Sequence, residues 1–185
     1  MKNKPTVYRL VITAVCIALC VILPYAFHAI PNGGILFSPM HLPVLLCGII
    51  CGPLYGLLCG LAGPFLSSVL TGMPVWAYLP TMMIELAIYG LVSGLMMHLV
   101  HTDRQLLDLY ISLLSAMLSG RIITGIIRAL IFAKGTYTIK AWATGYFVSC
   151  FPAIILQLIL IPILYTALKK AGLLPASTVS VPHKS

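Results

Sequence analysis

The chain has 185 residues, of which 61% are hydrophobic and 8% are charged, and its mean hydropathy is +1.08. A soluble domain carries about 25% charged residues, so this composition excludes a soluble globular protein and is typical of one integral membrane domain. The net charge of +8 comes from 11 Lys and Arg against 3 Asp and Glu. Because the basic residues lie mostly at the ends of apolar segments, orientation in a membrane explains them better than a nucleic-acid partner does.

The first apolar segment covers residues 9–27 and follows a short basic tail, residues 1–8. It has the length of a signal peptide, but a cleavage site of small residues is missing, because Pro24 and two aromatic residues stand at its end. We therefore expect a retained transmembrane helix. Ala14 and Ala18 are four residues apart on it, and this spacing of small side chains suits close contact with another helix.

A glycine at every fourth position marks the stretch from Met40 to Gly72. Residues four apart share a helix face, and glycine on that face lets another backbone approach closely. Pro53 lacks an amide hydrogen and biases Gly52 away from helical angles. The sequence therefore predicts a hairpin, with helices over residues 39–52 and 54–71 separated by a tight Gly-Pro turn. The glycines of the row are Gly48, Gly52, Gly56 and Gly60.

Loops and three further apolar segments complete the predicted membrane domain. A loop over residues 28–39, which contains Asn32, precedes the hairpin and is rich in Pro and Gly. Trp76 and Tyr78 stand at the start of the fourth span, as aromatic residues at a membrane interface do. The remaining spans cover residues 78–100, 109–133 and 142–168, and the segments between spans cover residues 72–77, 101–108 and 134–141.

Six spans place both ends of the chain on the same side of the membrane. That side then carries seven basic residues and the other side two, so the positive-inside rule puts both termini in the cytoplasm. We expect an all-α integral membrane protein with six transmembrane helices: a cytoplasmic tail (1–8), a membrane domain (9–170) and a disordered cytoplasmic tail (171–185). The seven are Lys2, Lys4, Arg9, Arg104, Lys169, Lys170 and Lys184, and the two are Lys134 and Lys140.

Three ionisable side chains lie inside the predicted spans, where each is costly unless it is paired or hydrated. Counting about 1.5 Å per residue from the outer ends of the spans places Glu85 and Arg128 at depths of roughly 10 and 8 Å, so we expect them to pair. Arg121 lies roughly 18 Å deep, near the midplane, and Gln157 falls close to that level.

Polar side chains form two stripes on the predicted helices, since residues three, four and seven apart share one face. The first stripe is Arg121, Thr124, Gly125 and Arg128, and the second is Met82, Glu85 and Tyr89. We expect both to face a hydrated cavity open to the outside, where Arg121 binds a carboxylate or phosphate and Tyr89 and Gln157 supply neutral contacts. The alternative is that the charges are structural. His41, beside the outer loop, is either a structural cap, a simple interfacial residue or a ligand contact.

The sequence contains no Walker loop, no His-Glu-x-x-His and no Gly-x-Ser-x-Gly motif. Its six cysteines all lie in apolar segments, and we interpret them as small buried hydrophobic residues, because no histidine in the same span completes a metal site. We therefore predict no enzyme activity, no metal and no cofactor. The cysteines are Cys16, Cys20, Cys47, Cys51, Cys59 and Cys150.

Taken together, these features resemble the substrate-binding S components of energy-coupling factor (ECF) vitamin transporters. The resemblance covers about residues 9–170 and rests on six spans in a chain of 185 residues, the hairpin from Leu42 to Gly60, and the Ala14–Ala18 pair. Its most specific parts are the Gly-Pro-x-x-Gly turn and the Ala-x-x-x-Ala motif.

The resemblance implies a subunit of the bacterial plasma membrane that captures a vitamin or related micronutrient outside the cell. It implies docking, through the face of Ala14 and Ala18, onto a transmembrane T subunit that carries two ATPases. The implied ligand site lies in the outer half, walled by spans four to six and covered by the loops 28–39 and 72–77. Asn32, in the first of these loops, is therefore a further candidate ligand contact.

The excess of Arg over Glu favours a ligand with an acidic group, and pantothenate and folate-like compounds are the candidates. The chain lacks the Met-His start expected of the nickel and cobalt members of the family. Two other classes of protein stay open. A stand-alone secondary transporter of a small polar solute would need its own ion-coupling site and often internal repeats. A structural membrane protein would need no ligand, although two arginines on one helix face argue against it.

Overall fold

The computed structural model describes residues 6–26, 37–102, 104–132, 138–148 and 150–174, and every regular element in these ranges is a helix. Five of these helices are long and apolar enough to cross a membrane, and α3 is apolar but shorter. The all-helical prediction is confirmed, while the count of six spans stays a prediction. The helices are α1 (Thr6–Ala26), α3 (His41–Cys51), α4 (Pro53–Thr71), α5 (Leu79–Leu99), α6 (Gln105–Ile127), α7 (Ile139–Ala143) and α8 (Phe151–Lys170), with π-helical turns η1 (Arg128–Phe132) and η2 (Thr144–Val148).

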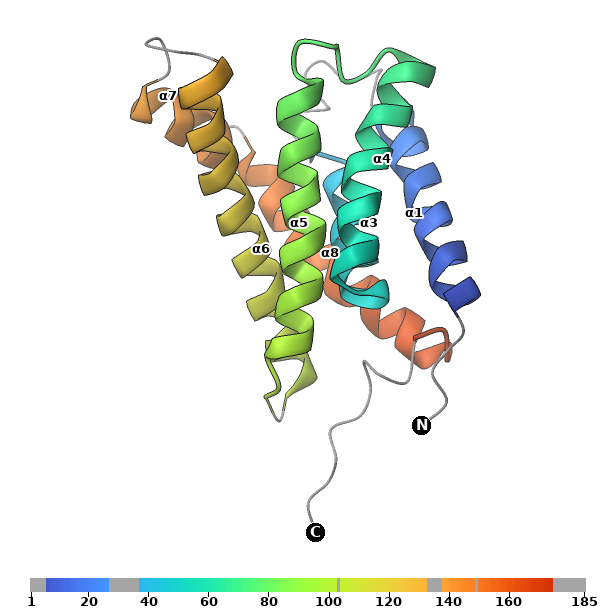
Figure 1. Cartoon of the computed structure of the whole chain (residues 1–185). Helices are drawn as coiled ribbons and strands as arrows, with labels where there is room; N and C mark the ends of the chain where they lie inside the picture. Colours follow the sequence, from blue (N-terminus) through green and yellow to red (C-terminus); the bar gives the residue numbers. More distant parts are fainter. Residues whose placement is uncertain (1–5, 27–36, 103, 133–137, 149, 175–185) are drawn as a thin grey trace.

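The short helix α3 lies at the centre of the bundle. It packs against α1, α4 and α5, and ten of its eleven residues are buried. A helix that is apolar all round is one that other protein covers. At about 1.5 Å per residue, α3 is about 16 Å long, well short of a hydrocarbon core of about 30 Å. Protein rather than lipid therefore surrounds it, and Figure 1 shows it behind α4.

The turn between α3 and α4 is the predicted Gly-Pro turn. Gly52 has a φ of 102°, a region that side chains with a Cβ rarely enter, and its N–H donates to the Gly48 carbonyl at 2.9 Å. Pro53 is the first residue of α4, where its missing N–H costs no helical hydrogen bond. The helical hairpin and the place of its turn are therefore confirmed.

Glycines bring the backbones of α4 and α5 into direct contact. A Cβ atom added at Gly56 would fall on the carbonyl group of Gly90, and one added at Gly90 would fall on that of Gly56. Gly48 also faces Gly90, and Gly60 faces the backbone of Leu86. The expectation that the glycine row permits close helix packing is therefore confirmed.

Helices α1, α4, α5 and α6 stand side by side, and α8 crosses behind them (Figure 1). The start of α1, the end of α8 and the connection from α5 to α6 lie at one end of the bundle, whereas the connection from α4 to α5 lies at the other (Figure 1). Trp76 and Tyr78, in the latter connection, are exposed. Which end faces the cytoplasm stays a prediction from charge.

The fifth helix begins earlier than predicted. Helix α6 starts at Gln105, inside the expected connector over residues 101–108. Asp108 lies in its first turn, where a carboxylate is favourable near the positive end of the helix dipole. Its Oδ1 also accepts a hydrogen bond from the Thr102 N–H at 2.8 Å. Asp108 thus stabilises the start of the helix.

The prediction of one continuous sixth span over residues 142–168 is wrong. The described part of this segment consists of α7, the π-helical turn η2 and, beginning at Phe151, the helix α8. Pro152 is in the first turn of α8. Proline is tolerated in a first turn but breaks a helix interior, since it removes a hydrogen bond and its ring clashes with the preceding turn. Pro152 therefore suits the start of α8, although the same helix also accommodates Pro162 in its interior.

Candidate functional site

Arg121 lies inside the bundle and is 4% exposed. Its Nε donates a hydrogen bond to the Oη of Tyr89 at 3.0 Å, and Tyr89 is itself fully buried. The indole N–H of Trp142 donates to the Arg121 carbonyl at 3.1 Å. Helices α5, α6 and α7 thus meet at this arginine. A guanidinium so deep in the molecule requires polar partners, because an uncompensated charge is costly there.

His41 and Glu85 extend the contacts of Arg121 to the central helix. The Nε2 of His41, at the start of α3, is 3.7 Å from the Oε1 of Glu85 on α5. The His41 ring also meets the Tyr89 ring edge-on, with 5.1 Å between ring centroids. Glu85, His41, Tyr89 and Arg121 therefore form one connected polar cluster on α3, α5 and α6, hereafter the Arg121 cluster. Its four members are all residues that the sequence pointed to.

The predicted ion pair between Glu85 and Arg128 is wrong. In the described part of the chain, the Oε1 of Glu85 lies nearest to the Nε2 of His41, at 3.7 Å. The guanidinium carbon of Arg128 instead lies 5.6 Å from the centre of the Tyr78 ring, a cation–π distance. Arg128 opens the π-helical turn η1, and a wider turn changes the direction in which the following side chains point. Similar depth in the membrane did not make the two side chains neighbours.

Several buried polar atoms have no hydrogen-bond partner within the described ranges. They are the Nδ1 of His41, the Oγ1 of Thr124, and the Oε1 and Nε2 of Gln157. Thr124 is fully buried and Gln157 is 1% exposed. Leaving such an atom unpaired costs about 1–3 kcal/mol, so three side chains offer hydrogen bonds that the described part of the protein does not use. Thr124 lies one turn from Arg121 on the same face of α6.

Two glycines of α6 make room for the aromatic residues around Arg121. A Cβ atom at Gly120 would fall on the ring of Tyr89, and one at Gly125 would fall on the indole of Trp142. Trp142 and Gly120 were not among the predicted site residues. Trp142 stood only as the first residue of the predicted sixth span. The available signal was two small residues, Gly120 and Gly125, on either side of Arg121.

The alanine pair predicted for docking lies on α1, which carries no member of the Arg121 cluster. Asn32 lies outside the residues that the structure describes. Ala14 and Ala18 are exposed on α1, on the side opposite Cys16 and Cys20, which are buried. The cysteines of α1, α3 and α4 belong to the hydrophobic core, as expected for small apolar residues; the Sγ of Cys20, for example, donates to the Met40 carbonyl at 3.6 Å.

Comparison with known proteins gives a family match over most of the chain. The family model described as "ECF transporter, substrate-specific component" matches residues 8–165. No curated protein and no solved structure matches the chain. The matched range includes all four members of the Arg121 cluster, together with Thr124, Gln157 and the exposed alanine pair of α1.

Proposed function

Because the chain belongs to the family of ECF transporter substrate-specific components, we propose that its Arg121 cluster binds a small water-soluble vitamin or precursor with an acidic group. Members of this family are multi-pass membrane subunits rather than enzymes, and they work with a T subunit and ATPase subunits on a small-molecule substrate. What the family leaves open is the substrate, and the buried side chains of this chain carry that part of the proposal.

The observation that carries the proposal is the set of buried polar atoms without partners. His41, Thr124 and Gln157 come from α3, α6 and α8 and offer both donors and acceptors. A ligand with several hydroxyl, amide or carbonyl groups would use them and remove their desolvation cost. Helix α8, which carries Gln157, has much less contact with α6 than α5 has, so a ligand between α6 and α8 would have little helix packing to rearrange.

The charge of Arg121 supports an acidic ligand group. Its guanidinium is buried, and the Oε1 of Glu85, the acidic residue of the neighbouring helix, lies 3.7 Å from the Nε2 of His41. A guanidinium binds a carboxylate or phosphate through two parallel hydrogen bonds, and such a contact is strong in a partly dry site. Tyr89 accepts a hydrogen bond from the Nε of Arg121. This bond would orient the fork of guanidinium N–H groups that forms the two parallel hydrogen bonds. Pantothenate and folate-like compounds have the required acidic group.

The other predicted contacts complete the proposal. Arg128, which lies over Tyr78 near the outer end of α6, and Asn32 would contact the ligand as it enters through the loops 28–39 and 72–77. Ala14 and Ala18 would dock the loaded subunit onto the T subunit, which carries two ATPases. The protein would act in a bacterial plasma membrane, with both termini in the cytoplasm.

The test identifies the ligand first and then measures its affinity. Mass spectrometry of the compound that co-purifies with the detergent-solubilised protein gives its identity. Calorimetry with that compound then compares the wild type with Arg121→Lys and Arg121→Ala. We expect both variants to lose about tenfold to a hundredfold in affinity, since a hydrogen bond to a charged group contributes about 1.5–3 kcal/mol and lysine cannot form the fork.

The matched control is Lys140→Gln, which removes one positive charge from an exposed residue of α7. It should bind the compound as tightly as the wild type. A cationic compound, or an Arg121→Ala variant with unchanged affinity, would remove the acidic ligand from the proposal. An Arg121→Lys variant that binds like the wild type would show that charge, without the fork, is sufficient.

A further inference from the structure

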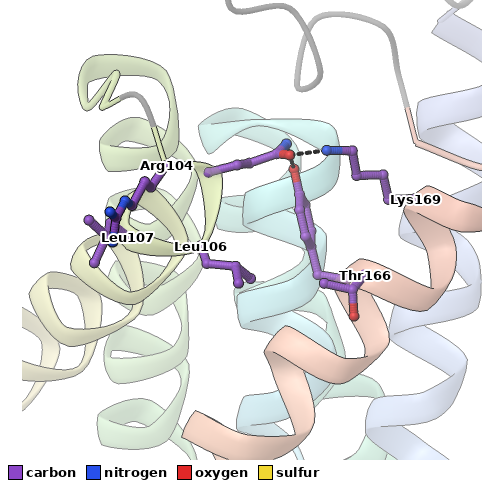
Figure 2. Close-up of a pocket in the computed structure, with 7 residues that line it drawn as sticks. Arg104, Leu106, Leu107, Thr166 and Lys169 are labelled. Carbon is purple, nitrogen blue, oxygen red and sulfur yellow. Dashed lines mark hydrogen bonds between the residues drawn. The ribbon is translucent and has the colours of Figure 1, made fainter.

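A groove of about 470 Å³ lies at the end of the bundle where α1 begins and α8 ends. Its walls are the first turn of α6 and the last two turns of α8 (Figure 2). Gln105, at its rim, is sixteen residues before Arg121 on α6, which corresponds to roughly 24 Å along the helix. The groove is therefore separate from the Arg121 cluster, and the ligand proposed above does not account for it.

Three side chains that line this groove are connected by hydrogen bonds, hereafter the polar bridge. The side-chain amide of Gln105 donates to the Oη of Tyr165 at 2.8 Å, and its oxygen accepts a hydrogen bond from the ammonium of Lys169. These hydrogen bonds join α6 to α8, and Figure 2 draws them as dashed lines beside Lys169. The bridge fixes the Lys169 ammonium at the rim through a neutral amide, and an ammonium has three donors, so the positive charge stays available.

The groove combines two basic side chains with apolar walls. Arg104 and Lys169 line it and are exposed, whereas Asp108, the acidic residue in the first turn of α6, is buried and accepts its hydrogen bond from Thr102. Leu106 and Leu107 also line it, and they are 50% and 45% exposed. Exposed leucines directly beside exposed cations occur where a membrane span leaves the hydrocarbon and meets the headgroup layer.

We propose that this groove binds an anionic phospholipid, with its phosphate on the Lys169 ammonium, Arg104 adding positive charge at the other side of the groove, and an acyl chain against Leu106. Basic pockets between transmembrane helices are the places where proteins hold anionic lipid headgroups. The loose packing of α6 against α8 leaves a gap that an acyl chain can fill. The positive-inside argument places the groove in the cytoplasmic leaflet. A soluble anion could form polar contacts with the basic side chains only, because the leucines on the other wall offer it no hydrogen bonds.

Native mass spectrometry of the full chain tests this proposal with two lipids of identical acyl chains, phosphatidylglycerol and phosphatidylcholine. The wild type should retain phosphatidylglycerol preferentially. Electrostatic attraction contributes about fivefold in affinity for each basic side chain near a membrane surface. The double variant Arg104→Gln, Lys169→Gln should therefore lose about 25-fold of this preference. Phosphatidylglycerol should also raise the thermal unfolding temperature of the wild type and not that of the variant.

The matched control is the double variant Lys140→Gln, Lys170→Gln, which removes the same charge from residues that do not line the groove. It should keep the wild-type preference. Equal loss in both double variants would reduce the effect to general surface charge and overturn the site. Equal retention of the two lipids by the wild type would also overturn it. Glycerophosphoglycerol, the same headgroup without acyl chains, should not compete; competition at equal concentration would make this a soluble-anion site instead.

Discussion

Tyr89 is the residue through which the Arg121 cluster holds together. Its hydroxyl accepts a hydrogen bond from Arg121, its ring meets the edge of His41, and its other side lies against Gly120. A tyrosine can do this because its apolar ring and polar tip serve different neighbours. The position of the guanidinium therefore depends on a residue that has no charge.

Replacing Gly120 by alanine should displace the Tyr89 ring, since the added methyl group would occupy its place. We expect the affinity for the co-purified ligand to fall about tenfold or more, because a small misplacement of binding groups is costly. Calorimetry measures the effect. Gly145→Ala is the control, because a Cβ atom there meets nothing within 4 Å. Equal affinities for the two variants would mean that Tyr89 does not position Arg121.

His41 and Glu85 should be coupled energetically, since their side chains are 3.7 Å apart and largely buried. In a double-mutant cycle on thermal stability, His41→Gln and Glu85→Gln should deviate from additivity by about 0.5 kcal/mol or more. Glu85→Gln and Arg128→Gln should be additive within about 0.5 kcal/mol. Additive effects for His41 with Glu85, together with coupled effects for Glu85 with Arg128, would instead support an ion pair between Glu85 and Arg128.

This pair shows where prediction from the sequence ends at the residue scale. Helical periodicity correctly selected Glu85, Tyr89 and Arg121 as inward-facing, because position along a helix fixes which face a side chain occupies. Depth alone then selected the partner of Glu85. Depth does not determine whether His41 or Arg128 is the neighbour of Glu85. That choice depends on the central position of α3 and on the π-helical turn at Arg128.

At the scale of the helices, the α4–α5 crossing depends on the absence of side chains. Gly56 and Gly90 place two backbones in contact, with Gly48 of α3 on the same spot. In a membrane, where apolar surface gains little by leaving lipid, close packing of this kind is a main source of helix association. The two helices that carry His41, Glu85 and Tyr89, which are α3 and α5, are positioned by this crossing.

Gly90→Ala should destabilise the protein by about 1–3 kcal/mol, the usual cost of overpacking, because its neighbour is the immovable backbone of Gly56. The thermal unfolding temperature in detergent should fall. Gly145→Ala, in open space, should leave it unchanged. Equal unfolding temperatures for the two variants would show that α4 and α5 can move apart at this point without a loss of stability.

The hairpin was predictable and the last span was not, although a proline marks both. Gly52-Pro53 sits between two glycine-spaced apolar runs, so the turn has a local cause on each side. Pro152 sits inside an apolar run without a preceding glycine, and a membrane helix can tolerate such a proline when neighbours satisfy the freed backbone. Whether it kinks a helix or starts one depends on packing that the sequence does not contain.

For the whole molecule, α1 is the helix that offers most surface to other partners. Only 17% of its most apolar window is buried, and Ala14 and Ala18 lie on the exposed side. Small side chains on an exposed face give no stability to the isolated subunit. They suit a contact that forms only when another helix arrives.

The double variant Ala14→Trp, Ala18→Trp should bind its ligand normally but abolish uptake in cells that contain the T subunit and ATPases. The bulky rings would prevent close helix approach. The control is Leu114→Trp, Leu118→Trp, which places two rings on exposed positions of α6 and should preserve uptake. Unchanged uptake in the alanine double variant would remove these residues from the docking face.

The central position of α3 has a consequence for how this sequence can change over time. Val11 and Val15 on α1 are more than half exposed, whereas Val44 and Leu45 on α3 are completely buried. Lipid accepts any apolar side chain, but a close-packed interior responds to a single methylene. A saturation library selected for substrate uptake should therefore keep every large apolar residue at Val11 and Val15 and reject most of them at Val44 and Leu45. In its tolerance to substitution, α3 would then resemble the core of a soluble protein, although it lies inside a membrane protein.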